Sequence, residues 1–167
     1  SQVAVPILPD DTAHEVFEKV TVAAETALWQ VLPALLDGSA PRIPLVIQPG
    51  QYFGGRKPED GRIDWAQPAR VIHDLVRAVA PPYPGAFTDI GGQRVEVLET
   101  RVLGAPQGAP ASVPAAAPPA ATLALHDGRL VATCADGGRL WIRQLRVDGQ
   151  PLDAAAFAAR WALPLQV

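Results

Sequence analysis

The spacing of hydrophobic residues changes near Gly85, and this change constrains the fold more than any other feature of the sequence. Before Gly85, apolar residues recur every three or four positions, which is typical of amphipathic helices. After it, apolar and polar residues alternate in short stretches, which is typical of antiparallel strands. We therefore predict an α+β chain in two parts, residues 1–85 with helices and residues 86–167 with a small antiparallel sheet or barrel.

The first part begins with a predicted strand at Val3–Leu8 and a long helix after it. Thr12 and Glu15 have the spacing of a capping box, and Asp37-Gly38 provides a stop. Between them one apolar stripe follows the helix, formed by Val16, Val20, Ala24, Ala27, Leu28, Val31 and Leu35. A stripe of this kind predicts a helix that packs against another element.

The remainder of the first part is rich in Pro and Gly and contains a second helix. Leu45–Ile47 is a short candidate strand, and Gly54–Gly61 is a polar loop. Pro68 suits the first turn of a helix at Gln67–Val79. The run Ala80–Gly85, with three prolines, ends this helix abruptly.

Five strands are predicted in the second part, because the apolar residues there alternate with polar ones. They are Ala86–Ile90, Val95–Leu103, Leu123–His126, Arg129–Cys134 and Leu140–Val147. The pairs Gly91-Gly92 and Asp127-Gly128 are strong signals for two-residue hairpin turns. Residues 104–121, nearly all Ala, Pro and Gly, predict an irregular loop, and Asp153 predicts the start of a last helix that runs through Trp161.

Composition excludes several classes of function. The net charge is −3, and the 14 Lys and Arg residues are spread along the chain, which argues against bulk binding to nucleic acid or acidic membranes. The single Cys134 excludes an internal disulfide and a cysteine-based zinc cluster, and it fits a reducing, cytoplasmic compartment. No apolar run approaches the 18 residues of a membrane span, and no pair of histidines has metal-ligand spacing, so we expect neither a membrane segment nor a metal.

Charged residues that could carry chemistry gather between residues 54 and 64. Glu59, Asp60 and Asp64 could act as acid and base, but solvated loop charges explain them more simply. The run Gly54–Lys57 could cradle a phosphate, although it lacks the spacing of a P-loop. No nucleophile motif is present, so the residues themselves predict no catalytic group.

The same region resembles a signature of the folate-dependent formyltransferases. The similarity covers Tyr52–Trp65 and continues through Pro68-Ala69, Ile72-His73, Val76–Ala78 and Pro82–Phe87. In that superfamily a Rossmann-like domain carries the chemistry and leads into a C-terminal OB-like barrel. The resemblance implies that residues 1–85 are the end of the catalytic domain and residues 86–167 are the barrel.

Within the superfamily, the sequence Arg56–Asp60 is most similar to the UDP-4-amino-4-deoxy-L-arabinose formyltransferases, which are bacterial enzymes. Methionyl-tRNA formyltransferase is similar in Ile63–Trp65 and in the Pro-Gly turn. Residues 85–167, however, contain seven Arg and seven acidic residues, and this even balance argues against a tRNA partner. An amino sugar nucleotide is therefore the expected substrate of the parent enzyme.

The resemblance also implies what the chain lacks. The family uses an Asn, a His and an Asp that lie before the point where this sequence begins, and the sequence contains no Asn. The cofactor 10-formyltetrahydrofolate is expected for the parent, whereas no cofactor and no activity are expected for the isolated chain. A stand-alone OB-like module that binds a protein or an oligonucleotide is the alternative from a different class.

Two groups of residues are the candidate sites. Arg56, Lys57, Pro58, Glu59 and Asp60 are predicted to contact substrate, because an arginine side chain can donate paired hydrogen bonds to phosphate. A solvated loop held by its own ion pairs is the alternative. Pro82, Tyr83, Pro84 and Gly85 are predicted to form a hinge between the domains.

The first 38 residues have a further expected property. The stripe between Val16 and Leu35 would pack on a sheet that is mostly absent from this sequence. An exposed apolar face tends to acquire a partner, so we predict self-association through residues 1–38 or disorder there.

Overall fold

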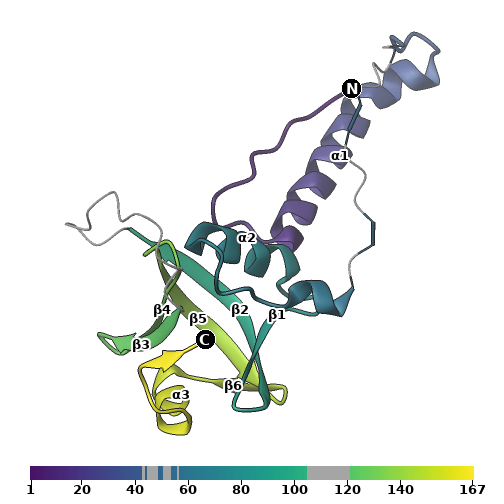
Figure 1. Cartoon of the computed structure of the whole chain (residues 1–167). Helices are drawn as coiled ribbons and strands as arrows, with labels where there is room; N and C mark the ends of the chain where they lie inside the picture. Colours follow the sequence, from purple (N-terminus) through teal and green to yellow (C-terminus); the bar gives the residue numbers. More distant parts are fainter. Residues whose placement is uncertain (43, 45–48, 51–53, 56, 105–120) are drawn as a thin grey trace. The chain divides into compact units, whose positions relative to one another are not determined.

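The computed structural model describes residues 1–42, 44, 49–50, 54–55, 57–104 and 121–167. These residues form two compact units, Ser1–Arg56 and Lys57–Val167 (Figure 1). The candidate strand at Leu45–Ile47 and nearly all of the predicted loop at 104–121 lie outside the described residues.

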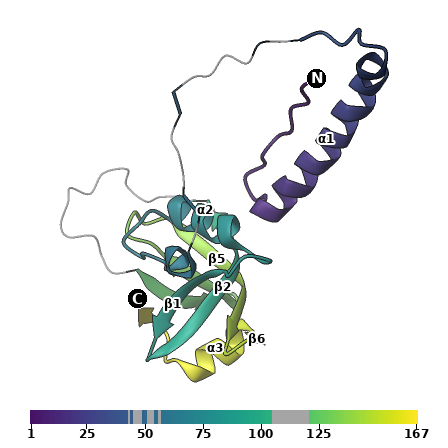
Figure 2. The same cartoon turned by 90° about the vertical axis from the view of Figure 1, so that its right-hand side faces the viewer.

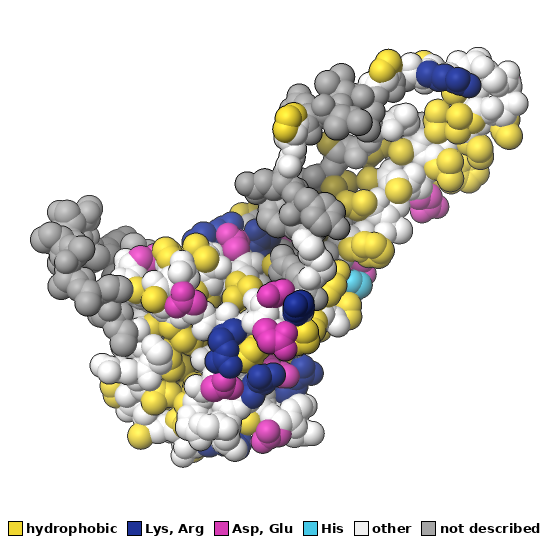
Figure 3. All heavy atoms as spheres, turned by 45° about the vertical axis from the view of Figure 1, so that its right-hand side comes forward, with side chains coloured by type: hydrophobic (Ala, Val, Ile, Leu, Met, Phe, Trp, Pro, Cys, Tyr) yellow, Lys and Arg dark blue, Asp and Glu magenta, His cyan; other side chains and the backbone are white. Residues whose placement is uncertain are grey.

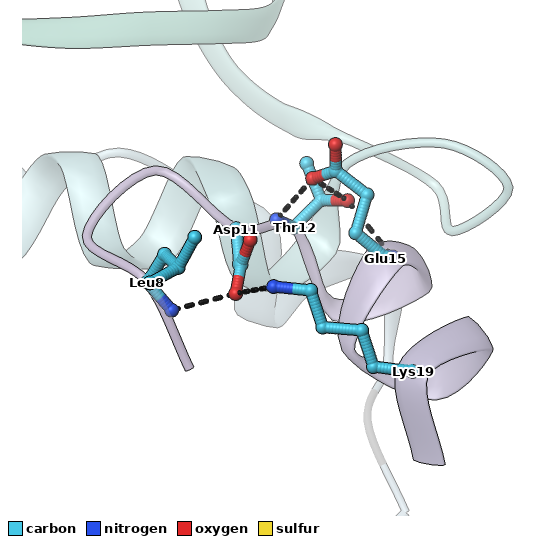
Figure 4. Close-up of polar contacts among 5 residues, drawn as sticks. All are labelled: Leu8, Asp11, Thr12, Glu15 and Lys19. Atoms are coloured by element: carbon cyan, nitrogen blue, oxygen red, sulfur yellow. Dashed lines mark hydrogen bonds and ion pairs between the residues drawn. The ribbon is translucent and has the colours of Figure 1, made fainter. Parts of the chain in front are cut away.

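The first unit contains one long helix, α1 (Ala13–Leu36), where the sequence predicts it. Its capping box is formed as expected: the Glu15 backbone N–H donates to Thr12 Oγ1 at 3.2 Å, and the Thr12 backbone N–H donates to Glu15 Oε2 at 2.7 Å (Figure 4). These two bonds satisfy backbone donors that a helix start otherwise leaves unpaired.

Asp11 joins the segment before α1 to the second turn of the helix. Its Oδ2 atom accepts from the Leu8 backbone N–H at 2.6 Å and from Lys19 Nζ at 2.5 Å (Figure 4). The Asp11 side chain is buried, and a buried carboxylate is tolerated because both contacts are charge-assisted or backbone hydrogen bonds.

The predicted strand at Val3–Leu8 is wrong. These residues have no strand assignment and belong to no ladder among the described residues. A strand requires a neighbour that accepts and donates its backbone hydrogen bonds, and Pro6 removes one donor from this segment. Apolar composition alone therefore suggested a strand where the described residues supply no paired neighbour.

The apolar side chains of α1 are largely exposed within its own unit. Val20, Leu28 and Leu35 of the predicted stripe have relative exposures of 48%, 54% and 54%, and Ala23 is the helix residue that is buried. Figure 3 shows hydrophobic side chains gathered along this helix. The expected stripe is therefore present, but the first unit does not cover it.

The second unit is built around a curled, seven-stranded antiparallel sheet. Its strands are β1 (Ala86–Ile90), β2 (Gln93–Leu103), β3 (Thr122–His126), β4 (Arg129–Thr133), β5 (Arg139–Val147), β6 (Gln150–Leu152) and β7 (Leu165–Gln166). Their order is β1-β2-β5-β4-β3-β7, with β6 beside β5. No ladder joins β1 to β7 within the described residues, so the expected barrel is an open half-barrel here (Figure 2).

Tight turns connect most neighbouring strands as the sequence predicts. Gly91-Gly92 and Asp127-Gly128 both adopt positive φ angles at their two central residues, which matches the right-handed twist of the flanking strands. Asp148-Gly149 forms a third turn of this type and leads into β6. Sequence patterning missed β6 and β7 because each is too short to show an alternation of period two.

Two helices pack with this sheet at opposite ends (Figures 1 and 2). They are α2 (Ala69–Val79) and α3 (Ala154–Arg160), both near their predicted positions, and α3 is capped by Asp153. The start of α2 is capped from a distant hairpin: Asp136 Oδ1 accepts from the Ala69 N–H at 3.3 Å and from the Gly138 N–H at 2.9 Å. An ideal Cβ atom on Gly138 would lie 2.8 Å from Ala69 Cβ, so helix and hairpin are in close contact.

One hydrophobic core joins α2, α3 and the concave side of the sheet. It includes Ile72 and Val76 from α2, Leu140 and Ile142 from β5, and Phe157 from α3. Because α2 packs on β2, the compact units separate at residue 56, before the predicted domain boundary at residue 85. The boundary at 85 as a division of the parent enzyme stays a prediction.

Candidate functional site

The predicted substrate loop is a short turn of 3-10 helix, η1 (Pro58–Gly61). Asp60 Oδ2 accepts from the Lys57 N–H at 2.8 Å, and the Arg62 N–H donates to the Glu59 carbonyl at 3.1 Å. Pro58 suits this turn because its fixed φ angle matches a helical first position. Lys57, Pro58, Glu59 and Asp60 are all exposed, and Arg56 lies outside the described residues.

The predicted hinge, Pro82–Gly85, is a tight turn between α2 and β1. The Gly85 N–H donates to the Val79 carbonyl at 2.8 Å, and Gly85 has a φ angle of 88°, which favours glycine. Pro82, Tyr83 and Pro84 are exposed, whereas Gly85 is buried. The side chains of the turn therefore face solvent, whereas its last residue, Gly85, packs against the rest of the second unit.

The structure brings the loop and the turn together, which no local sequence signal predicts. A Cβ atom on Gly61 would lie 2.5 Å from the Gly85 carbonyl oxygen, so only glycine fits there without a shift. Beyond the contact, the Ile63 N–H donates to the Phe87 carbonyl at 2.8 Å, and Arg62 and Phe87 form an isolated parallel bridge. The loop is thus fixed onto the start of β1.

Sequence reasoning missed a charged cluster beside this contact. Arg62 Nη2 lies 2.7 Å from Asp89 Oδ2, and the guanidinium carbons of Arg62 and Arg94 lie 5.0 and 4.0 Å from the centre of the Phe87 ring. Figure 3 shows Lys and Arg side chains interspersed with Asp and Glu on one face of this unit. The signal was available, because Asp89 and Arg94 flank the predicted Gly91-Gly92 turn and must face each other across the hairpin.

The cations of this cluster suit recognition of an anion more than acid–base chemistry. Arg62 and Arg94 are held near Phe87 by cation–π contacts, which orient their donors. Hydrogen bonds from the Gln67 side chain and the Ala66 N–H hold the pKa of Asp64 below its usual range, so Asp64 stays ionised at neutral pH. In the described part of the chain, no group of three His, Cys, Asp or Glu residues could hold a metal ion.

Two reactive side chains, those of His73 and Cys134, are buried in the core. His73 Nδ1 lies 3.0 Å from Thr100 Oγ1 beneath α2, and both residues are buried. Burial raises the pKa of the Cys134 thiol to about 11, with a smaller contribution from Asp136. Cys134 is therefore a small apolar core residue and does not serve as a nucleophile at neutral pH.

A shallow cavity of about 440 Å³ lies elsewhere in the second unit, over β5 and β6. Leu98, Arg143, Arg146 and Leu152 are among its lining residues. None of the predicted site residues lines it, so the cavity and the charged cluster are separate features.

Comparison with known families identifies this fold. Residues 56–161 match the formyl transferase C-terminal domain, and the chain belongs to that family. The matched region begins where the second compact unit begins, so the family assignment and the boundary at residue 56 agree.

Solved structures with the same fold are distant in sequence. HypX from Aquifex aeolicus in complex with tetrahydrofolic acid has a TM-score of 0.60 and 19% identity over 93% of this chain and 26% of that chain. WlaRD, a sugar 3N-formyl transferase crystallised in the presence of dTDP and 5-N-formyl-THF, has a TM-score of 0.58 and 13% identity over 89% of this chain and 47% of that chain. The chain thus spans about a quarter of HypX and about half of WlaRD.

None of the described helices combines the length and the apolar character that crossing a bilayer requires.

Proposed function

We propose that this chain is the C-terminal part of a folate-dependent formyltransferase whose acceptor is the amine of an amino sugar nucleotide. The observation that carries the proposal is the family match over residues 56–161, which includes the loop with the sequence Arg-Lys-Pro-Glu-Asp. The WlaRD neighbour is a sugar formyltransferase studied with dTDP, and both WlaRD and HypX were solved with folates, which supports the substrate class and the cofactor.

In the proposed reaction, the amine of the sugar attacks the formyl carbon of 10-formyltetrahydrofolate. A new C–N bond forms, the bond to N10 of the folate breaks, and a proton passes from the amine to the departing tetrahydrofolate. A positioned acid–base group and a donor to the developing oxyanion are needed for these steps. The sequence contains no Asn, and the structure offers no exposed acid–base pair in the cluster, so we expect no turnover by the isolated chain.

The role proposed for residues 56–60 is contact with the phosphates of the substrate. Lys57 is exposed at the first position of the turn, and Arg56 precedes it in the sequence. Lys57 gives a fixed position for an anionic group, because the loop is anchored at Gly61 and the turn itself is held by Asp60. Pro82–Gly85 is proposed as the hinge, since it contacts the anchored end of this loop.

Methionyl-tRNA is the second candidate acceptor. The even balance of seven Arg and seven acidic residues in 85–167 gives the domain no overall positive field, which such a polyanion would favour. The amino sugar nucleotide is therefore preferred.

The first test is the size of the natural gene product, measured by immunoblot with an antibody raised against this chain. A band much heavier than 17.6 kDa is expected, and that protein, purified from its source cells, should transfer formyl groups to a UDP-linked amino sugar. A band at 17.6 kDa would contradict the proposal and favour a stand-alone binding module.

The second test examines the loop in the heavier protein. Lys57→Ala should raise the KM for the sugar nucleotide about tenfold with little change in kcat, because it removes a phosphate contact made in the ground state. Arg70→Ala, which removes an exposed cation from α2, is the matched control. Preference for methionyl-tRNA over the sugar nucleotide would contradict the proposed acceptor.

A further inference from the structure

The arginines of the second unit are not evenly distributed over the sheet. Along β5, Leu140 and Ile142 are buried in the core, so Arg139, Trp141 and Arg143, which alternate with them, point to the opposite side. This outer side of β5 is only partly covered: Arg143 is exposed, and Arg139 and Trp141 are half-buried.

A neighbouring strand adds a third arginine to this side. Trp141 is paired with Val131 of β4, and Arg129 lies two residues before Val131, so Arg129 is on the same side of the sheet. The guanidinium carbons of Arg129 and Arg143 lie 4.6 and 5.2 Å from the Trp141 ring centre. We call the group Arg129, Arg139, Trp141 and Arg143 the arginine–tryptophan face.

Two of these arginines have unused hydrogen-bonding capacity. Arg143 forms an ion pair with Glu99, whose other carboxylate oxygen accepts from Gln144 at 2.8 Å. Arg129 and Arg139 have no carboxylate partner among the described residues. The contact with Trp141 restrains Arg129, so an incoming anion would meet a partly pre-organised donor.

We propose that the arginine–tryptophan face docks an acidic segment of a partner protein. Tryptophan and arginine are enriched among residues that dominate protein–protein binding energy, and here they form one contiguous group. Charge complementarity then selects a partner segment rich in Asp and Glu.

Other partner classes fit this face less well. A small anionic metabolite usually binds in a concave site, and of this face only Arg143 lines the shallow cavity over β5 and β6. A single-stranded nucleic acid favours free aromatic faces for stacking and a basic domain. Trp141 instead lies against two guanidinium groups, and residues 85–167 have equal numbers of arginines and acidic residues.

The proposal is tested by titrating the full chain with a fluorescent oligoglutamate peptide and measuring fluorescence anisotropy. Oligothymidylate is titrated in parallel. The wild-type chain should bind oligoglutamate more tightly than oligothymidylate, and Arg129→Gln with Arg139→Gln should weaken peptide binding at least about tenfold. Added salt should also weaken the binding.

The control variant carries Arg70→Gln and Arg160→Gln, which remove the same charge from α2 and α3. Its affinity for oligoglutamate should match that of the wild type, and circular dichroism should show that both double variants are folded. An equal loss of affinity for oligoglutamate in the two double variants, or no binding by the wild type, would overturn the proposal. Tighter binding of oligothymidylate that depends on Arg129 and Arg139 would overturn it in favour of a nucleic-acid surface.

Discussion

Gly61 is the residue on which the candidate site depends most directly. A methyl group at this position would overlap the Gly85 carbonyl oxygen, which is backbone and cannot rotate away. Gly61→Ala should therefore lower the free energy of unfolding by about 1–3 kcal/mol, the usual cost of overpacking a close contact. Urea denaturation followed by circular dichroism measures this loss.

The matched control for that variant is Gly104→Ala, where a Cβ atom would meet no atom of the described residues within 4 Å. Its stability should stay within about 0.5 kcal/mol of the wild type, as is usual for surface changes. Equal stability of the Gly61 variant and the wild type would show that the loop and the turn separate easily.

Cys134 provides a second prediction at the residue scale. Burial raises its pKa to about 11, so at pH 8 little thiolate is present and the sulfur is inaccessible. A thiol reagent such as iodoacetamide should label the native chain very slowly and the urea-unfolded chain completely, as measured by mass spectrometry. Rapid labelling of the native chain would mean that the core around β4 opens readily.

Single residues also show where sequence reasoning reaches its limit. The turn residues Gly91-Gly92 and the helix cap Thr12 were predictable because their signals are local. The approach of Gly61 to Gly85 and the position of Arg62 near Phe87 were not, because each joins segments more than 20 residues apart. Such contacts follow from the packing of the whole unit.

At the scale of elements, α2 depends on a carboxylate from the hairpin between β4 and β5. Removing Asp136 leaves the Ala69 N–H without its partner at the start of the helix. Asp136→Ala should therefore lower the free energy of unfolding by about 1 kcal/mol, the typical effect of losing a helix cap. Thermal unfolding of the variant measures the loss.

Asp148→Asn is the control for this prediction, because Asp148 is exposed in the next hairpin and asparagine tolerates its positive φ angle of 51°. Its melting temperature should match that of the wild type. A lower melting temperature in both variants would indicate a general effect of losing an acidic charge.

The start of α1 should respond to acid. Hydrogen bonds from the backbone N–H and then the hydroxyl of Thr12 lower the pKa of Glu15 below its usual value of 4.5. The stabilisation by this carboxylate is therefore fully present above pH 4.5 and is lost as the pH falls through the lower pKa of the folded state. Helicity measured by circular dichroism should fall over this range, and less so in Glu15→Gln.

Glu25→Gln on the same helix is the comparison, since no hydrogen bond to the Glu25 side chain is present in the described structure. It should keep the wild-type pH dependence. If Glu15→Gln and Glu25→Gln titrate alike, the capping box does not control the helix start.

Elements differ in how far the sequence predicts them. All three α-helices and the five longer strands lie within a few residues of their expected bounds, because each has a regular hydrophobic period or, for α3, the cap residue Asp153. The segment Val3–Leu8 has strand composition without a paired neighbour, and β6 contains a proline within three residues. Whether such a segment forms a strand depends on backbone hydrogen bonds to a strand elsewhere in the chain.

At the scale of the whole molecule, the uncovered stripe of α1 predicts self-association. Leu28 and Leu35 are each 54% exposed, and burying them between copies would remove apolar surface from water. Light scattering should give a mass above the 17.6 kDa monomer, and Leu28→Glu with Leu35→Glu should restore the monomer mass.

Val71→Glu is the control, because Val71 is an exposed apolar residue of the second unit with 49% relative exposure. That variant should associate like the wild type. A monomer mass for the wild type at all concentrations, with α1 intact, would refute self-association through residues 1–38.

The cap that Asp136 provides to α2 also has an evolutionary consequence. Position 69 and position 138 share one small space, since a side chain at 138 would collide with Ala69 Cβ. In related sequences, these two positions and position 136 are expected to vary together, although more than 65 residues separate the helix from the hairpin. A lineage that acquires a larger side chain at one of these positions must change another of them to keep the contact. The helix and the hairpin are therefore expected to evolve together.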